Sequence, residues 1–289
     1  MSTAVMTDEN SGISREKAKE LGIFMMRMPF FINGEVKYQE TDMTVKEFYD
    51  ALDAGAEVST SQPSPGDVMD MWEGILEQGY DDIIYIPMSS GLSESCNSAK
   101  VFAEDYDGRV EIADNHRISV TMEQSVYDAL KYAKQGMNAF EIKNRLEKEA
   151  YDASIYIAVD TLAYLKKGGR VTAAAAAIGT VLNLKPVLTI QGEKLDAYAK
   201  ERGMKKARHV MIKAMQKDFE ERFAELDKQG RMRLCIAYSH VDDETLQSWI
   251  DEVNEAFPGR NLLISPLSLS IGCHIGPGAL AIAACRMEP

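Results

Sequence analysis

Two short segments of the chain are rich in hydroxyl side chains, and each precedes a predicted helix. They are Ser59-Thr-Ser-Gln-Pro-Ser64 and Ser89-Ser-Gly-Leu-Ser93. A helix N-terminus has free N–H groups and the positive end of the helix dipole, which together favour an anion. Hydroxyls add donors without adding charge, and Gly91 lets the backbone approach a ligand closely. The two segments are candidate binding loops for a carboxylate or a phosphate, although either one alone is more often a simple helix cap.

Arg170 and His274 are two further candidate site residues. Arg170 ends the tight turn Leu165-Lys-Lys-Gly-Gly-Arg170, and His274 is a lone imidazole in an otherwise apolar segment. A lone histidine there is more often a hydrogen-bonded core residue than a catalyst, and an isolated arginine equally forms a surface ion pair. An alternative hypothesis is a serine-dependent hydrolase or transferase in which His274 is the base for Ser90.

The common enzyme signatures and metal motifs are absent from the sequence. The nucleophile elbow would need glycine where Pro87 stands, and neither a phosphate-binding P-loop nor a dinucleotide-binding glycine motif occurs. The four histidines and four cysteines lack metal-ligand spacing. We therefore expect no metal, no cofactor, and no kinase or dehydrogenase built on these loops, and we interpret the cysteines as reduced, buried thiols of a cytoplasmic protein.

Strand and helix patterns alternate in the first half of the chain. A buried-type strand at 82–87, a helix at 92–106, a strand at 109–113 and a helix at 119–134 follow one another. This order predicts an α/β fold with a mostly parallel, doubly wound sheet. Ligands of such sheets lie beyond the carboxyl ends of the strands, which directs attention to the loops at 58–65 and 87–93.

The second half predicts a further α/β unit. We expect strands at 155–159, 186–190 and 234–238, with an alanine-rich helix from Thr172 and helices at 204–228 and 243–256. The apolar region 262–285 is interpreted as buried strands joined by turns. At about 150 residues per domain, 289 residues correspond to two domains, which we place at 1–155 and 156–289.

Composition and charge exclude several classes of protein. Lys and Arg number 32 against 45 Asp and Glu, a net charge of -13 that disfavours nucleic acid as a ligand. The first ten residues lack the pattern of a signal peptide. Residues 261–285 carry no charged side chain, but two prolines and three glycines would interrupt a membrane-spanning helix. We therefore do not expect an integral membrane protein.

Five motifs stand out along the chain. They are Thr60-Ser-Gln-Pro-Ser64, Ser89-Ser-Gly-Leu-Ser93, Tyr164-Leu-Lys-Lys-Gly-Gly-Arg-Val171, Leu184-Lys-Pro-Val-Leu188 and His274-Ile-Gly-Pro-Gly-Ala279. Their order is the one seen in the DegV family, which the chain resembles from Thr7 to its last residue. DegV proteins are bacterial fatty-acid-binding proteins that serve as lipid-carrying subunits of fatty acid kinase. Glu94-Ser95 departs from the Gly-Thr that commonly follows the second motif.

The resemblance implies a two-domain protein that holds one long-chain fatty acid between its domains. The carboxylate would be bound by Thr60, Ser90 and the backbone of Gly91, and Arg170 and His274 would belong to the surrounding polar network. Ser61 and Ser89 are neighbours of less certain role. Arg202 matches an exposed arginine of the family that works with the kinase subunit.

By the same resemblance, the chain is a non-catalytic carrier in phospholipid metabolism. It would present its fatty acid to a separate ATP-dependent fatty acid kinase, from a cytoplasmic location and with transient contact to a membrane surface. Burial of each CH₂ group contributes about 0.8 kcal/mol, so a long acyl chain suits an apolar tunnel. The 16 methionines are compatible with such a tunnel, although most are expected to fill the core. A third hypothesis is an accessory protein that binds a partner and no ligand.

Overall fold

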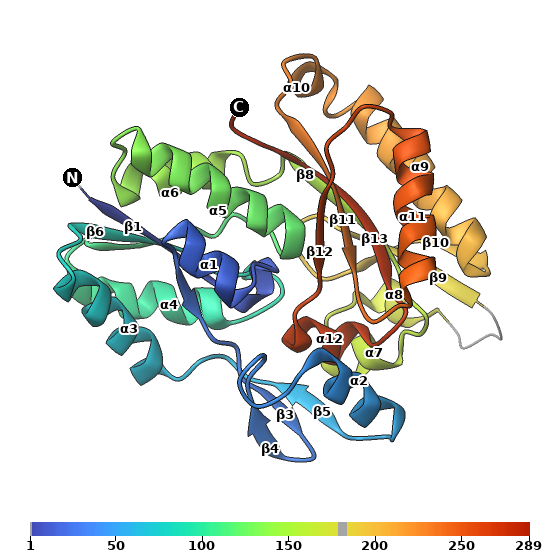
Figure 1. Cartoon of the computed structure of the whole chain (residues 1–289), viewed down its shortest axis with the longest axis horizontal. Coiled ribbons are helices and arrows are strands. Elements are labelled where there is room, and N and C mark those ends of the chain that lie inside the picture. Colours follow the sequence, from blue (N-terminus) through green and yellow to red (C-terminus); the bar gives the residue numbers. More distant parts are fainter. Residues whose placement is uncertain (1, 179–183) are drawn as a thin grey trace.

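The computed structural model describes residues 2–178 and 184–289, and its strands form two main sheets that lie side by side (Figure 1). The first sheet has four parallel strands in the order β2 (Phe24–Met26), β1 (Thr3–Asp8), β6 (Asp82–Ile86) and β7 (Val110–Ile112). Parallel neighbours place the carboxyl ends of all four strands at one edge. The loops that follow β1, β6 and β7 therefore meet there.

Helices cover both faces of this parallel sheet because its strands alternate buried side chains between the faces. Ile83 and Tyr85 face α3 (Pro65–Glu77) and α4 (Ser95–Ala103), which add the buried Trp72. Ile84 and Ile86 face α1 (Arg15–Leu21), α5 (Ser119–Lys134) and α6 (Ala139–Lys148). The predicted doubly wound arrangement is confirmed, whereas α6 was not predicted.

A small antiparallel sheet follows β2 and packs beneath the two main sheets in Figure 1. It contains β4 (Glu35–Lys37), β3 (Phe30–Ile32) and β5 (Val58–Thr60), and α2 (Val45–Asp53) lies between β4 and β5 in the chain. The Asn33-Gly34 turn has φ values of 50° and 85°, as a tight hairpin turn requires. This sheet places Thr60 at the end of β5, immediately before the loop that leads to α3.

The second main sheet has six strands and belongs to the second half of the chain. Its order is β10 (Asp196–Arg202), β9 (Leu184–Ile190), β8 (Ala153–Ala158), β13 (Leu280–Arg286), β11 (Met232–Tyr238) and β12 (Leu263–Pro266). Every neighbouring pair is antiparallel except β11 and β12. One face packs against α9 (Met204–Glu220) and α11 (Asp243–Ala256), and the other is turned toward α5 and the first half of the chain.

The interpretation of 262–285 as strands alone is wrong. Between β12 and β13 lies α12 (Leu269–Ile275), in which the Ser268 side chain accepts a hydrogen bond from the Ile271 N–H and Gly276 follows the last turn. Nearly all side chains of α12 are buried, so the sequence shows no amphipathic period that would distinguish a helix from a strand. The helix lies between the small sheet and α7 (Ala163–Gly168) (Figure 1).

Three other elements differ from prediction. The helix expected at 204–228 ends at Glu220, and the chain turns to bury Phe223 beside Phe219 before α10 (Ala224–Lys228) begins. The alanine-rich helix is short, α8 (Ala173–Ala176), and residues 179–183 lie outside the described part of the chain. Strand β10 was not predicted. No helix among the described residues is long and apolar enough to cross a membrane.

Candidate functional site

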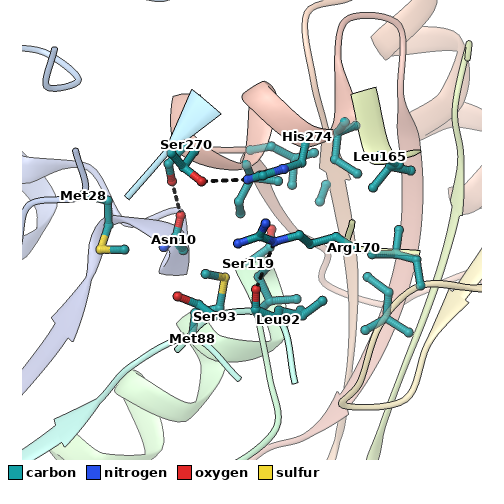
Figure 2. A pocket seen from close by; sticks show the side chains of 18 of the residues that line it. Asn10, Met28, Met88, Leu92, Ser93, Ser119, Leu165, Arg170, Ser270 and His274 are labelled. Atoms are coloured by element: carbon teal, nitrogen blue, oxygen red, sulfur yellow. Dashed lines mark hydrogen bonds between the residues drawn. The ribbon is translucent and has the colours of Figure 1, made fainter. Parts of the chain in front are cut away.

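A cavity of about 540 Å³ lies where the loops of the parallel sheet meet the inner face of the six-stranded sheet. Figure 2 shows labelled side chains from both halves directed toward this space. Its lining residues are Asn10, Met28, Thr60, Ser61, Gln62, Met88, Leu92, Ser93, Glu94, Ser98, Ile118, Ser119, Val120, Ile155, Ile157, Leu165, Arg170, Ile190, Leu195, Ala237, Leu267, Ser270, Ile271, His274, Ile275 and Ala281.

The walls of the cavity differ in polarity. Loops of the first half supply most of its hydroxyl and amide groups, whereas strands β8, β9, β11 and β13 supply mainly aliphatic side chains. Ala237 and Ala281 are a cross-strand pair on this apolar wall. The space therefore suits a ligand with one polar end and a hydrocarbon body. Both loops that the sequence predicted, 58–65 and 87–93, contribute to it.

His274 and Thr60 form the first polar contact of the site. Helix α12 carries His274, and its Nε2 lies 2.8 Å from Oγ1 of Thr60 at the end of β5. Burial and, to a smaller extent, the positive charge of Arg170 together lower the pKa of His274 to about 4. The imidazole is therefore neutral at physiological pH and a weak base.

The close packing of His274 against Gly168 indicates which ring nitrogen carries the proton. Nδ1 of His274 is buried without a hydrogen-bond partner in the described structure, and a Cβ at Gly168 would collide with it. A lone pair costs less to leave unpaired than an N–H donor, so we assign the proton to Nε2. Nε2–H then donates to Thr60 Oγ1, which leaves the Thr60 O–H free to donate into the cavity.

Arg170 supplies positive charge to the same space. It follows α7, whose residues 165–168 were expected to form a turn and are helical instead. Gly169 caps this helix in a left-handed conformation, and the Arg170 side chain is half-buried. Its Nε donates to the Leu92 carbonyl at 3.3 Å, and one terminal nitrogen donates to the Gly168 carbonyl at 2.5 Å. These bonds hold the guanidinium across the cavity, where Figure 2 shows it extending from the side of Leu165 toward Asn10.

The loop 89–93 differs in detail from prediction. Ser89 is buried and its hydroxyl donates to the Gly192 carbonyl, while the Ser90 N–H donates to Asp114 Oδ1 at 3.2 Å. Gly91 packs against the backbone of Gly192 and Glu193. These three residues therefore face neighbouring protein, and none of them lines the cavity.

Ser93 takes the position on the cavity wall that the sequence interpretation gave to Ser90. The N–H groups of Leu92 and Ser93 both donate to the Ser89 carbonyl, and this tight turn reverses the direction in which successive side chains point. The Ser93 hydroxyl also accepts from the Ser95 N–H at 3.2 Å, which supports the start of α4. Ser93 belongs to the predicted hydroxyl-rich motif, so the sequence indicated it as a candidate. The sequence did not predict the turn that directs Ser93, and not Ser90, toward the cavity.

The alternative hypothesis of a serine-dependent enzyme needs Ser90 beside His274. The structure instead places the Ser90 side chain on Asp114 and the His274 Nε2 on Thr60. Burial alone would raise the pKa of Asp114, but hydrogen bonds from Lys100 and Ser90 together lower it, so Asp114 is a carboxylate that holds Ser90 in place. The proposed nucleophile and base are therefore not paired.

Of the two remaining predicted residues, Ser61 lines the cavity and Arg202 does not. Ser61 lines it and is exposed, with its N–H donating to the Pro29 carbonyl. Arg202 is exposed at the end of β10 and does not line the cavity. Residues 2–178 and 184–289 contain no cluster of histidine, cysteine and acidic side chains that would hold a metal ion.

Several polar lining residues were not predicted, among them Asn10, Ser119 and Ser270. Asn10 follows β1 in a short 3₁₀ turn (η1, Glu9–Ser11), Ser119 begins α5 after β7, and Ser270 belongs to α12. Asn10 and Ser119 lie at carboxyl ends of parallel strands, a position that the topology rule covers. Ser270 had no such signal because the sequence was not interpreted as a helix there.

The fold and the cavity define an α/β protein in which an amphipathic cavity lies between two sheets. The chain belongs to the DegV family, because the model of that family, described as uncharacterised proteins, matches residues 2–287. A DegV domain-containing protein of Deinococcus radiodurans is 30% identical over 100% of this chain and 99% of its own.

Solved structures of the family have the same fold. A DegV family protein from Thermus thermophilus, described by its fatty acid binding, aligns with a TM-score of 0.88 and 29% identity over 99% of this chain and 100% of its own. DegV of Bacillus subtilis, described as a fatty acid binding protein, aligns with a TM-score of 0.82 and 27% identity over 99% of both chains.

Proposed function

We propose that this protein binds one long-chain fatty acid, with the carboxylate at the polar wall of the cavity and the acyl chain against the apolar wall. The observation that carries the proposal is the amphipathic cavity of about 540 Å³, which falls within the range of about 300–1,000 Å³ usual for small-molecule sites. The fatty acid binding of the Thermus thermophilus and Bacillus subtilis relatives supports the same ligand class.

In this proposal Thr60, Ser93 and Arg170 bind the carboxylate, and Ser93 replaces Ser90 among the ligand contacts. His274 acts through Thr60: its Nε2–H bond to Oγ1 directs the threonine O–H toward the ligand. Arg170 adds a charge-assisted bond, which is stronger than a neutral one. Ser61 lines the same cavity, and we include it among the residues that contact the carboxylate.

The acyl chain supplies most of the binding free energy. Each buried CH₂ contributes about 0.8 kcal/mol, so about 16 carbons give roughly 10 kcal/mol before the entropy of ordering the chain is subtracted. Flexible side chains such as Met28 and Met88 adapt to a flexible ligand. Retention of lipid through purification is the consequence.

We further propose that the protein is a non-catalytic carrier that presents the carboxylate to a separate ATP-dependent fatty acid kinase in the cytoplasm. The acyl phosphate formed there would pass to phospholipid synthesis during transient contact with a membrane surface. Arg202, exposed at the end of β10, is the residue that we assign to the kinase contact. Replacing Arg202 with alanine is expected to leave the lipid content unchanged and to lower the rate of phosphorylation by the kinase.

Denaturing mass spectrometry of the purified protein tests the central proposal. We expect about one fatty acid per chain in the organic extract, and a delipidated sample should take up added palmitate or oleate to the same ratio. An empty protein that also fails to bind either fatty acid would overturn the assignment. Turnover of acyl esters, lost in Ser90→Ala, would instead support the enzyme hypothesis.

A further inference from the structure

Asn10 has a side chain that is fully buried and only half satisfied. It lies in η1, directly after β1, with 0% of its surface exposed, and it lines the cavity. Its Oδ1 accepts hydrogen bonds from Ser268 Oγ at 2.9 Å and from Ser270 Oγ. Its Nδ2 has no partner in the described structure. A buried donor without a partner is rare in native proteins and needs an explanation.

The serine hydroxyls hold the oxygen of the Asn10 amide. The Ser268 and Ser270 hydroxyls lie 3.2 Å from each other, and in the structure both donate to Oδ1, which leaves the NH₂ group as the unpartnered end of the amide. Ser268 is itself held as the cap of α12, and the Asn10 backbone N–H is held by Asp8 Oδ1 at 2.8 Å. An acceptor in the cavity stabilises this orientation of the amide, because it gives the otherwise unpartnered Nδ2 donor a hydrogen bond.

Helix α12 connects Asn10 to the contacts already described. Ser270 and His274 are four residues apart in this helix, so they lie on one face with their Cβ atoms about 5–6 Å apart. Ser270 contacts Asn10 and His274 contacts Thr60, and all four residues line the cavity. One face of α12 therefore anchors both donors at the same cavity.

We propose that the Asn10 side-chain amide is a ligand-binding group that donates to an oxygen of the bound head group, opposite Thr60. This inference rests on the proposed function and names the chemistry of the head group: the amide recognises an acceptor, such as a carboxylate oxygen. Because the amide is uncharged, it is also able to donate to the carbonyl or phosphoryl oxygens of an acyl phosphate. In this proposal Asn10 favours fatty acids because its N–H donates to a carboxylate oxygen, whereas an acceptor at the same position would repel that oxygen.

Asn10→Asp reverses this property with the smallest change of shape. The carboxylate retains an acceptor for Ser268 and Ser270 but replaces the donor with a charged acceptor. We expect delipidated Asn10→Asp to bind palmitate about 10- to 100-fold more weakly than the unmodified protein. Binding of hexadecanol, whose hydroxyl is able to donate, should be unchanged or stronger. Calorimetric titration with both ligands measures the two affinities.

Asn115→Asp is the matched control. Asn115 is 1% exposed, its side-chain amide also lacks partners in the described structure, and it does not line the cavity. This control separates the effect of a buried Asn→Asp change on stability from an effect on ligand choice. We expect the ratio of palmitate to hexadecanol affinity to stay at the unmodified value. Asn10→Ala provides the comparison without a new charge and should weaken palmitate binding alone.

The outcomes distinguish this inference from the proposed function. If folded Asn10→Asp and Asn10→Ala both bind palmitate with unmodified affinity, the amide has no part in head-group binding and the inference is wrong. If the unmodified protein binds no fatty acid, the proposed function fails first. If the variants lose palmitate and hexadecanol to the same extent, Asn10 shapes the cavity without selecting the head group, which also overturns the inference.

Discussion

At the scale of single residues, the direction of each hydroxyl distinguishes the side chains that face the cavity from their neighbours in the sequence. Thr60 is held by His274 and faces the cavity, whereas Ser90 is held by Asp114 and faces away from it. We expect Thr60→Val, which preserves the branched shape, to weaken palmitate binding by about 10- to 100-fold. Ser93→Ala should also weaken binding, and Ser90→Ala should change it little. Titration of the delipidated variants measures all three, and a large loss in Ser90→Ala alone would restore the original interpretation.

Glu9 is a buried carboxyl beside the cavity whose titration affects stability. Burial raises the pKa of Glu9, and a hydrogen bond from the Met28 N–H and the charges of Arg15 and Arg27 partly offset this rise. The resulting pKa is about 7. An acid with a raised pKa in the folded state stabilises the fold below its unfolded pKa of about 4.5, and this contribution is lost as the pH rises toward 7. Asp8, whose pKa burial raises to about 6, acts in the same direction. His274 acts oppositely between about pH 6.5 and 4, because its pKa is lowered.

Glu9→Gln is therefore expected to stabilise the protein at pH 8 by about 1–3 kcal/mol. Its amide oxygen is able to accept the Met28 N–H, so the change removes the charge and preserves the bond. In denaturant unfolding measured between pH 5 and 8, the free energy of unfolding should decline less steeply with pH than in the unmodified protein. Glu16→Gln, on the exposed surface of α1, is the control and should leave the slope as it is. A variant with the unmodified slope would contradict the assignment to Glu9.

At the scale of elements, the turn at 89–93 and the turn after β9 depend on a close backbone contact. A Cβ at Gly91 would lie 2.7 Å from the Gly192 carbonyl oxygen and 2.8 Å from Glu193 Cα, so backbone would have to move. We expect Gly91→Ala to lower the free energy of unfolding by about 1–3 kcal/mol and to reduce lipid retention, because Ser93 follows in the same turn.

Gly74→Ala in α3 is the control for Gly91→Ala. Nothing lies within 4 Å of a Cβ at Gly74, and alanine is the better helix former, so this change should stabilise by about 0.5–1 kcal/mol. The midpoint of urea unfolding compares the two. Equal stabilisation in both variants would show that the contact between the two turns is not tight in solution.

At the scale of the whole molecule, the six-stranded sheet decides how much space the ligand has. Residues of β13 alternate between the cavity face, which includes Ala281, and the face against α9 and α11, which includes Ala284. We expect Ala281→Leu to shift the co-purified fatty acids toward chains shorter by about two to four carbons, because its side chain extends into the cavity.

Ala284→Leu adds the same atoms to the opposite face of the strand. It should lower stability by overpacking the other core and leave the distribution of acyl chains unchanged. Mass spectrometry of the extracted lipid reads out both variants. An identical chain-length profile in Ala281→Leu would mean that the acyl chain does not reach this wall.

The sequence by itself determined most elements and the edge at which the site forms. Loop 58–65 reaches the cavity from β5 of the small antiparallel sheet and not from the parallel sheet. Short runs of apolar residues defined the parallel strands, and the rule on their carboxyl ends directed attention to 87–93. The Asn33-Gly34 pair specifies a tight turn by its own backbone preferences. These features depend on neighbours in the chain, where side-chain period and turn chemistry act directly.

Only the tertiary structure decided which side chains meet in the cavity. Helix α12 is buried on nearly all sides, so no period distinguished it from a strand, and its serines had no predicted partners. Asn10 contacts Ser270 across 260 positions of the chain, and Thr60 contacts His274 across 214. Ser93 rather than Ser90 faces the cavity because Asp114 and Gly192 fix the turn before it. Such orientations arise from contacts between distant segments, which local sequence does not encode.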